Sequence, residues 1–186
     1  MSDSDLIFAA SWQSPSDLAT PPTPEQLPWL LDEHSLTQRL TELSEQQFAV
    51  QPLAEGWQVL RADECLALNV PIGSEGWVRE VYLLGAGIPW VFARSVAARA
   101  ELERAGVDLA SLGRRSLGEL LFSEWAFARG ELTLCQYPPL ALPAQAQHTG
   151  LWARRSCFSR ASLGVLVAEV FLPAFWQRIA NECAGR

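Results

Sequence analysis

The sequence predicts an α+β fold in which helices pack on a single antiparallel β-sheet. The first observation is the order of the elements, because short strands joined by hairpins have helices before and between them. The second is a hairpin signal, since two apolar strands flank the turn residues Ala86 and Gly87. The third is the length, since 186 residues fit one domain. We therefore expect a single domain over residues 1–186, with residues 1–22 as an extended N-terminal lead-in.

Two helices are expected early in the chain. Residues 23–26 (TPEQ) place a proline at the first helical position and a glutamine three residues after the N-cap, so a short helix should follow as far as Leu31. Residues 35–38 (SLTQ) form a second capping box, which should open a helix to about Ser44. The expected apolar face of this helix consists of Leu36, Leu40 and Leu43.

The middle of the chain has the pattern of strands. Strands are expected over residues 57–60 and 65–70, and the hairpin over residues 77–84 and 89–96. A helix over residues 97–105 should then end at Gly106, because glycine readily adopts the left-handed conformation that terminates helices.

The last third continues with both kinds of element. Residues 116–119 (SLGE) form a third capping box, which predicts a helix running through Leu121 and Phe122. Residues 127–137 should contain a strand. A final pair of strands, 151–158 and 164–172, should precede a closing helix over residues 173–183.

All 14 basic residues are arginines, and with 21 acidic residues they give a net charge of -7. Because the chain has no lysine, Schiff-base, pyridoxal-phosphate and P-loop lysine chemistry is excluded. The acidic balance argues against nucleic acid as the main partner. The acidic excess lies in residues 1–64, whose net charge is -9, whereas residues 65–186 carry a net charge of +2.

Cysteine and histidine give no sign of a metal or redox site. The four cysteines form no CxxC motif and are interpreted as buried, reduced thiols. The two histidines, His34 and His148, belong to no cluster with metal-ligand spacing, so neither a metal nor a cofactor is expected. The N-terminus is acidic where a secretory signal would be basic, and the longest apolar run, residues 81–93, is too short to span a bilayer. We therefore expect a cytoplasmic protein without an integral membrane segment.

The hairpin carries the first candidate site residues. With Ala86 and Gly87 as the turn, paired residue numbers sum to 173, which would place Arg79 directly opposite Arg94 on an apolar face. Like charges directly opposite destabilise a sheet, and apolar surroundings increase the cost. Such a pair requires either buried protein carboxylates or an anionic ligand, and the planar guanidinium can hold a carboxylate through two hydrogen bonds.

Glu169 and two helix N-termini extend this candidate site. Alternation places Glu169 on the apolar face of its strand, where a carboxylate needs a partner or becomes protonated. An ion pair with Arg79 or Arg155 would satisfy it structurally, and a functional role is the alternative. Leu36 and Leu117 would occupy first helical positions, whose backbone N–H groups can bind a carboxylate unless water or the caps satisfy them. Together these features predict a buried pocket for a small organic acid.

Six segments resemble the chorismate pyruvate-lyase family and lie in order from about residue 29 to residue 174. They are Trp29-Leu30-Leu31 with Ser35-Leu36-Thr37-Gln38-Arg39, Trp77-Val78-Arg79-Glu80-Val81, Pro89-Trp90 with Ala93-Arg94-Ser95-Val96, Leu117-Gly118 with Leu121-Phe122, Gly150-Leu151-Trp152-Ala153-Arg154-Arg155-Ser156, and Glu169-Val170-Phe171-Leu172-Pro173-Ala174. The resemblance implies a cofactor-independent lyase that converts chorismate to 4-hydroxybenzoate and pyruvate, the first step of ubiquinone biosynthesis.

The resemblance also implies site residues. In the family, residues matching Arg79 and Glu169 contact the bound aromatic acid, as do backbone groups of residues matching Leu36 and Leu117. Leu36 stands where the family usually has methionine, but a backbone contact should survive that change. Residues 97–116 and 175–186 depart from the family pattern.

Our mechanistic hypothesis assigns the catalytic roles to Arg79 and Glu169. Arg79 and the amides of Leu36 and Leu117 hold the ring carboxylate, and Glu169 accepts a hydrogen bond from the ring hydroxyl. Arg94 faces the enolpyruvyl carboxylate, because chorismate is a dianion. We further expect a monomer with helical flaps near Leu36 and Leu117 that cover a buried ligand pocket, together with product inhibition by 4-hydroxybenzoate.

Two other classes of protein fit part of the pattern. The same fold resembles the effector domains of some bacterial transcription regulators, which bind small ligands without turning them over. Those domains follow a winged helix-turn-helix, and only about 22 residues precede the first capped helix here. In a structural or adaptor protein, Arg79, Arg94 and Glu169 would instead form an internal ion-pair network.

Overall fold

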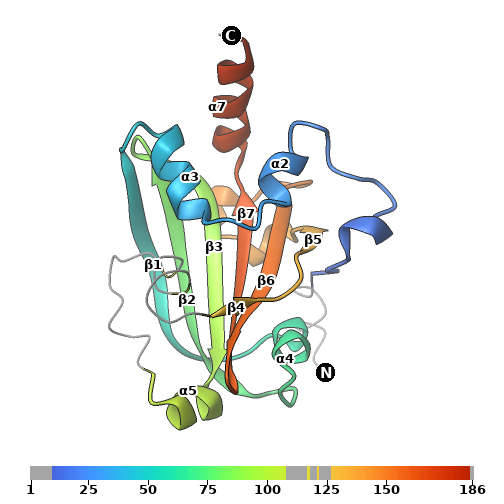
Figure 1. The fold of residues 1–186 in the computed structure, drawn as a ribbon, viewed down its shortest axis with the longest axis vertical. Helices are drawn as coiled ribbons and strands as arrows, with labels where there is room; N and C mark the ends of the chain where they lie inside the picture. The colour runs from blue at the N-terminus through green and yellow to red at the C-terminus, as the bar shows by residue number, and fades with distance from the viewer. Residues whose placement is uncertain (1–9, 108–116, 118–120, 122–126, 185–186) are drawn as a thin grey trace.

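The computed structural model describes residues 10–107, 117, 121 and 127–184. Its centre is one antiparallel sheet of seven strands in the order β1-β2-β3-β7-β6-β4, with β5 also paired to β6 (Figure 1). The strands are β1 (Phe48–Val59), β2 (Glu75–Gly85), β3 (Ile88–Ala98), β4 (Ala128–Arg129), β5 (Thr133–Gln136), β6 (Trp152–Arg160) and β7 (Leu163–Phe171). The α+β prediction is confirmed.

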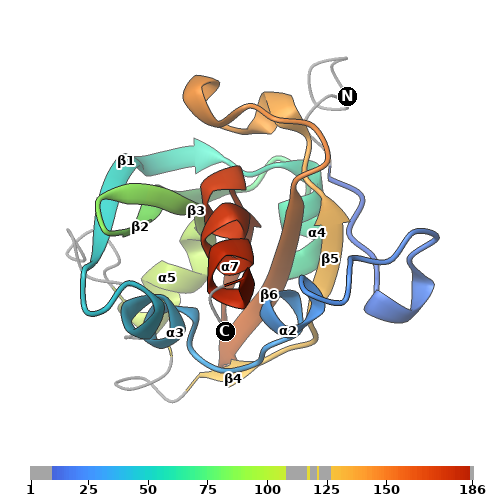
Figure 2. The same ribbon diagram turned by 90° about the horizontal axis from the view of Figure 1, so that it is seen from above.

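Helices cover both faces of this sheet. The α-helices are α2 (Leu27–Leu30), α3 (Leu36–Leu43), α4 (Ala62–Leu68), α5 (Arg99–Ala105) and α7 (Pro173–Ala184), and short 3-10 helices are η1 (Pro15–Asp17), η4 (Pro139–Ala141) and η5 (Ala144–Ala146). Helices α2 and α3 lie over the same face near one end of the strands, joined by a connecting segment, and α7 projects beyond that end (Figures 1 and 2). No helix in the described part of the chain is long and apolar enough to cross a bilayer.

The alternation of side chains along the strands gives the sheet two apolar faces. On the α3 face, leucines of α2 and α3 pack with Val81, Leu83 and Phe171. On the opposite face, Cys65 and Leu68 of α4 pack with strand residues such as Val78. The face to which a polar residue belongs therefore decides whether it lies near α3 or near α4.

Several elements follow their local sequence signals closely. The hydroxyl of Ser35 accepts a hydrogen bond from the Gln38 amide at 3.3 Å, which caps α3 as predicted, and the three predicted leucines of α3 are buried. Helix α5 ends at Gly106, whose φ of 64° is left-handed, although Ala97 and Ala98 belong to β3. The predicted start of α2 is wrong, because the helix begins at Leu27 and not at Pro24. Residues 24–26 form a turn in which Thr23 N donates to Gln26 Oε1.

The strand predicted over residues 65–70 is wrong, because these residues lie largely in α4. Arg61 N donates to Glu64 Oε2 at 2.9 Å, which stabilises the first turn of that helix, and Asn69 ends it with a φ of 55°. Helical spacing also buries Cys65 and Leu68 against the sheet. The strand predicted over residues 57–60 is the end of β1, which begins at Phe48.

The hairpin between β2 and β3 is confirmed, but its predicted register is wrong. Ala86 and Gly87 form the turn with φ angles of 51° and 77°, the left-handed conformation that a two-residue hairpin turn requires. Leu84 pairs with Pro89, but the next residue, Leu83, pairs with Val91. Trp90 is therefore an extra residue on β3, and the register shifts by one beyond it. The Trp90 ring packs where a Cβ on Gly85 would lie, and its side chain is buried in the core.

This one-residue shift separates two residues that were predicted to face each other. Arg79 pairs with Ser95, and Arg94 pairs with Glu80. Because side chains alternate between faces, Arg79 and Arg94 lie on opposite sides of the sheet.

Two further predictions concern the helix over residues 116–122 and the burial of the cysteines. The predicted helix over residues 116–122 lies mostly outside the described residues, so only the placement of Leu117 and Leu121 is known. All four cysteines are free. Cys65 and Cys135 are buried as predicted, whereas Cys157 is half-buried and Cys183 is exposed, so the prediction of a buried thiol is wrong for Cys183 and only partly met by Cys157.

Candidate functional site

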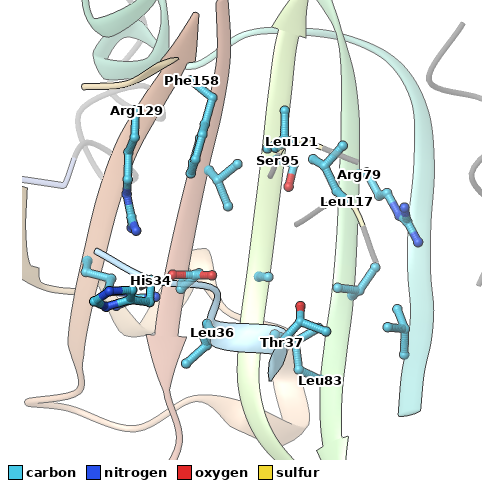
Figure 3. Close-up of a pocket in the computed structure, with 16 residues that line it drawn as sticks. His34, Leu36, Thr37, Arg79, Leu83, Ser95, Leu117, Leu121, Arg129 and Phe158 are labelled. Atoms are coloured by element: carbon cyan, nitrogen blue, oxygen red, sulfur yellow. Dashed lines mark hydrogen bonds and ion pairs between the residues drawn. The ribbon is translucent and has the colours of Figure 1, made fainter. Parts of the chain in front are cut away.

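A pocket lies between the sheet and α3, and it encloses about 580 Å³ of empty space including its opening to solvent (Figure 3). Its walls are mainly apolar, and its polar groups come from six different segments of the chain. The lining residues are His34, Leu36, Thr37, Val50, Arg79, Val81, Leu83, Ala93, Ser95, Leu117, Leu121, Arg129, Arg154, Phe158, Val167 and Glu169. Four of the five predicted site residues therefore line one pocket, namely Leu36, Arg79, Leu117 and Glu169.

Arg79 stands on β2 at the β1 side of the pocket. Only 3% of its side chain is exposed, and its Nε lies 2.8 Å from the carboxylate of Glu55, the residue opposite it on β1. Burial lowers the pKa of Arg79, and the negative charge of Glu55 opposes that shift. Glu55 therefore helps to keep the buried Arg79 side chain positively charged in an apolar wall. Arg79 needs this charge to bind an anion.

Glu169 has a partner that the sequence did not suggest. Its carboxylate lies 2.6 Å from Nε of Arg154, the residue opposite it on β6. The predicted partners were Arg79 and Arg155, and the structure contradicts both. Arg155 lies on the other face of the sheet and pairs with Asp63 at 3.0 Å.

Arg154 links Glu169 to the segment that covers the pocket. Its Nη1 donates to the carbonyl oxygen of Trp29 in α2 at 2.9 Å and to that of Asp32 in the connection between α2 and α3 at 2.7 Å. Its side chain is almost wholly buried. The position of Glu169 is thus fixed from one side by a rigid cation.

Arg129 on β4 is a second pocket residue that sequence reasoning missed. Its Nε donates to Ser156 Oγ at 3.0 Å, and its Nη1 donates to the carbonyl oxygen of Glu33 at 2.8 Å. Burial lowers the pKa of Arg129, and the positive charge of Arg154 lowers it further. In the sequence, Arg154 was marked only by the family-like segment over residues 150–156. Arg129 was marked only by the strand predicted over residues 127–137.

The N-terminus of α3 forms the cover of the pocket. Leu36 and Thr37 face the pocket from the first turn of this helix, and Leu117 and Leu121 line it as well. The preceding residues are held by Asp32, whose carboxylate accepts from the His34 amide at 2.9 Å and from Arg39 at 2.6 Å. Burial alone would raise the pKa of Asp32, but its hydrogen bonds to His34 and Arg39 lower the pKa to about 2.

Arg94, the fifth predicted site residue, is not part of this pocket. It lies on the opposite face, where it donates to Glu64 at 2.6 and 3.1 Å and to Glu80 at 2.8 Å. Although burial opposes it, these hydrogen bonds and charges raise the pKa of Arg94. The prediction that Arg94 faces the same ligand as Arg79 is therefore wrong, and its cause is the register shift at Trp90.

The arrangement fits a flat apolar molecule with negative charge at its ends. Cations stand on both sides of the pocket, Arg79 towards β1 and Arg129 towards β6 (Figure 3), and the wall between them includes Val167 and Phe158. The Glu169 carboxylate can accept a hydrogen bond from a ligand hydroxyl. Among the described residues, no three His, Cys, Asp or Glu side chains come together as metal ligands would.

Comparisons with known proteins point to one family. The profile of the family described as "Chorismate lyase" matches residues 6–181. A Pseudomonas putida protein named "Probable chorismate pyruvate-lyase" is 59% identical over 180 residues, covering 97% of each chain. A Pseudomonas aeruginosa protein of the same name is 64% identical over 156 residues, covering 84% of this chain and 88% of its own.

Solved structures share the fold at low sequence identity. The ligand-binding domain of a GntR-family transcriptional regulator from Bordetella bronchiseptica aligns with 68% of this chain and 83% of its own, with a TM-score of 0.51 and 15% identity. The C-terminal domain of the histidine utilization repressor from Pseudomonas syringae aligns with 68% of this chain and 92% of its own, with a TM-score of 0.52 and 10% identity. These likenesses concern the fold alone.

Proposed function

The chain belongs to the chorismate lyase family, and on that premise we propose that it converts chorismate to 4-hydroxybenzoate and pyruvate. The observation that carries the proposal is the meeting of Arg79, Glu169 and the N-terminus of α3 in one largely apolar pocket. A carboxylate-binding cation and a hydroxyl acceptor on a flat apolar wall match the two polar ends of 4-hydroxybenzoate.

The reaction is an elimination in which atoms and charges balance. The bond between ring carbon C3 and the ether oxygen breaks, and its electron pair stays on that oxygen. The hydrogen on C4 leaves as a proton, and the ring becomes aromatic. The released enolpyruvate takes up a proton on its methylene carbon to give pyruvate. Because aromatisation favours this outcome intrinsically, we propose that no cofactor takes part and that orientation and charge stabilisation are the contributions of the protein.

We propose that Arg79 binds the ring carboxylate, assisted by backbone N–H groups at Leu36 and Leu117. The N–H of Leu36 opens α3, where the first amides have no partner within the helix. Glu169 accepts a hydrogen bond from the C4 hydroxyl, held in place by Arg154. The proposal also includes entry of the product into ubiquinone biosynthesis, product inhibition, and a monomer acting in the cytoplasm.

The test is a direct assay of the purified chain. Incubation with chorismate should release pyruvate and 4-hydroxybenzoate in equal amounts, measured by a coupled dehydrogenase assay and by absorbance. Treatment with a metal chelator should leave the rate unchanged. Binding of chorismate without turnover would instead favour a ligand sensor, and the absence of both binding and turnover would favour a structural role for the ion pairs.

A further inference from the structure

We propose that Arg129 binds the second carboxylate of chorismate, the one on the enolpyruvyl side chain, and stabilises the enolpyruvate as it leaves. The inference rests on the proposed function and names the residue that binds the departing enolpyruvate. It replaces Arg94, which the sequence suggested for this role and which lies on the opposite face of the sheet.

The substitution pattern of the ring determines where the side chain must lie. Chorismate carries one carboxylate on C1, the enolpyruvyl ether on C3 and the hydroxyl on C4. If the C1 carboxylate is at Arg79 and the C4 hydroxyl is at Glu169, then C3 is next to the Glu169 end of the ring. The enolpyruvyl group therefore extends away from Arg79 and towards the strands beyond β7.

The sheet order identifies the cations on that side. Arg79 stands on β2 and Glu169 on β7, while Arg154 and Arg129 stand on β6 and β4. Neighbouring strands are about 4.8 Å apart, so β4 is about two strand spacings beyond Glu169. A carboxylate three bonds from the ring can reach that part of the pocket, which Arg129 and Phe158 line (Figure 3).

Of the two arginines on that side, Arg129 is the better placed to bind substrate. Arg154 contacts Glu169 through its Nε at 2.6 Å, and its Nη1 binds two backbone carbonyls, so its charge and geometry serve the protein itself. Ser156 Oγ and the carbonyl oxygen of Glu33 orient the Arg129 guanidinium. Burial and the positive charge of Arg154 lower the pKa of Arg129, whereas the negative charges of Glu169, Glu33 and Asp32 raise it.

The interaction between Arg129 and the enolpyruvyl group should become stronger as the reaction proceeds. Negative charge develops on the ether oxygen when the C3–O bond breaks, and it is shared by the departing enolpyruvate. A fixed guanidinium beside that fragment stabilises the transition state more than the ground state, so it should increase kcat as well as substrate affinity.

The test compares substrate with product, because 4-hydroxybenzoate lacks the second carboxylate. Arg129→Ala should lower kcat/KM for chorismate at least tenfold, while the Kd for 4-hydroxybenzoate, measured by calorimetry, should change less than threefold. Arg129→Lys keeps the charge and should recover part of the loss. Arg79→Ala is the matched control, since it should both lower kcat/KM for chorismate and weaken the binding of 4-hydroxybenzoate.

Two outcomes would overturn the assignment. Equal losses for chorismate and 4-hydroxybenzoate in Arg129→Ala would mean that Arg129 only holds the Asp32–Glu33 backbone over the pocket. Unchanged chorismate kinetics would mean that it has no role in the reaction. A wild-type chain that does not turn over chorismate would instead refute the proposed function, and this assignment with it.

Discussion

Replacing Arg94 with alanine tests the assignment of this residue to the protein interior. Its side chain is 5% exposed and holds Glu64, which is 7% exposed, through two hydrogen bonds. A third hydrogen bond joins it to Glu80. Removing one member of a buried ion pair costs about 3–5 kcal/mol, because a buried charge remains without compensation. We expect a loss of about that size for Arg94→Ala.

The assay is urea and thermal unfolding at pH 7. For a chain of this length, about 3–5 kcal/mol corresponds to a fall in Tm of roughly 6–20 °C. Arg99→Ala is the matched control, because the Arg99–Glu75 pair has the same 2.6 Å separation but side chains that are 41% and 52% exposed. Exposed pairs contribute about 0–1 kcal/mol, so this variant should remain close to wild type.

Enzyme kinetics complete the test of Arg94. At a temperature where Arg94→Ala stays folded, its kcat/KM for chorismate should lie within about threefold of wild type, because the residue is on the face opposite the pocket. Adding Glu64→Gln to Arg94→Ala should recover part of the stability by removing the uncompensated charge of Glu64. If Arg94→Ala were as stable as Arg99→Ala but had lost its activity on chorismate, the reasoning would be refuted.

Three further predictions concern the pocket and its cover. Arg79→Ala should lower kcat/KM by about 10- to 150-fold, the equivalent of a charge-assisted hydrogen bond of about 1.5–3 kcal/mol, and wild-type rates would contradict its role. Added 4-hydroxybenzoate should slow chorismate turnover competitively, and progress curves insensitive to it would argue against slow product release. Asp32→Asn should destabilise the fold by at most about 2 kcal/mol at pH 7, as judged by urea unfolding. Because the folded pKa of Asp32 is lowered, that difference should be complete above about pH 4 and disappear as the pH falls towards 2; a difference independent of pH would exclude this cause.

Signals within a few residues of the chain predicted the parts of the fold that are set locally. The hydroxyl of Ser35 caps α3, Gly106 ends α5, and Ala86 and Gly87 make the hairpin turn, each through contacts between near neighbours in sequence. Helix α4, whose last residues were predicted as a strand, has an apolar run compatible with both strand and helix. Its helical form depends on the capping contact of Glu64 and on packing against the sheet.

The sequence by itself determined the fold class and four residues of the pocket, because alternation and helix caps specify which side chains share a face. The family was indicated separately, by the resemblance of six short segments. Only the tertiary structure decided the electrostatic partners. A single extra residue at Trp90 moved Arg94 to the other face, and pairing between strands distant in sequence brought Arg154 to Glu169 and Arg129 to the pocket. Register is a collective outcome of packing across the sheet, and a shift of one residue exchanges the two faces.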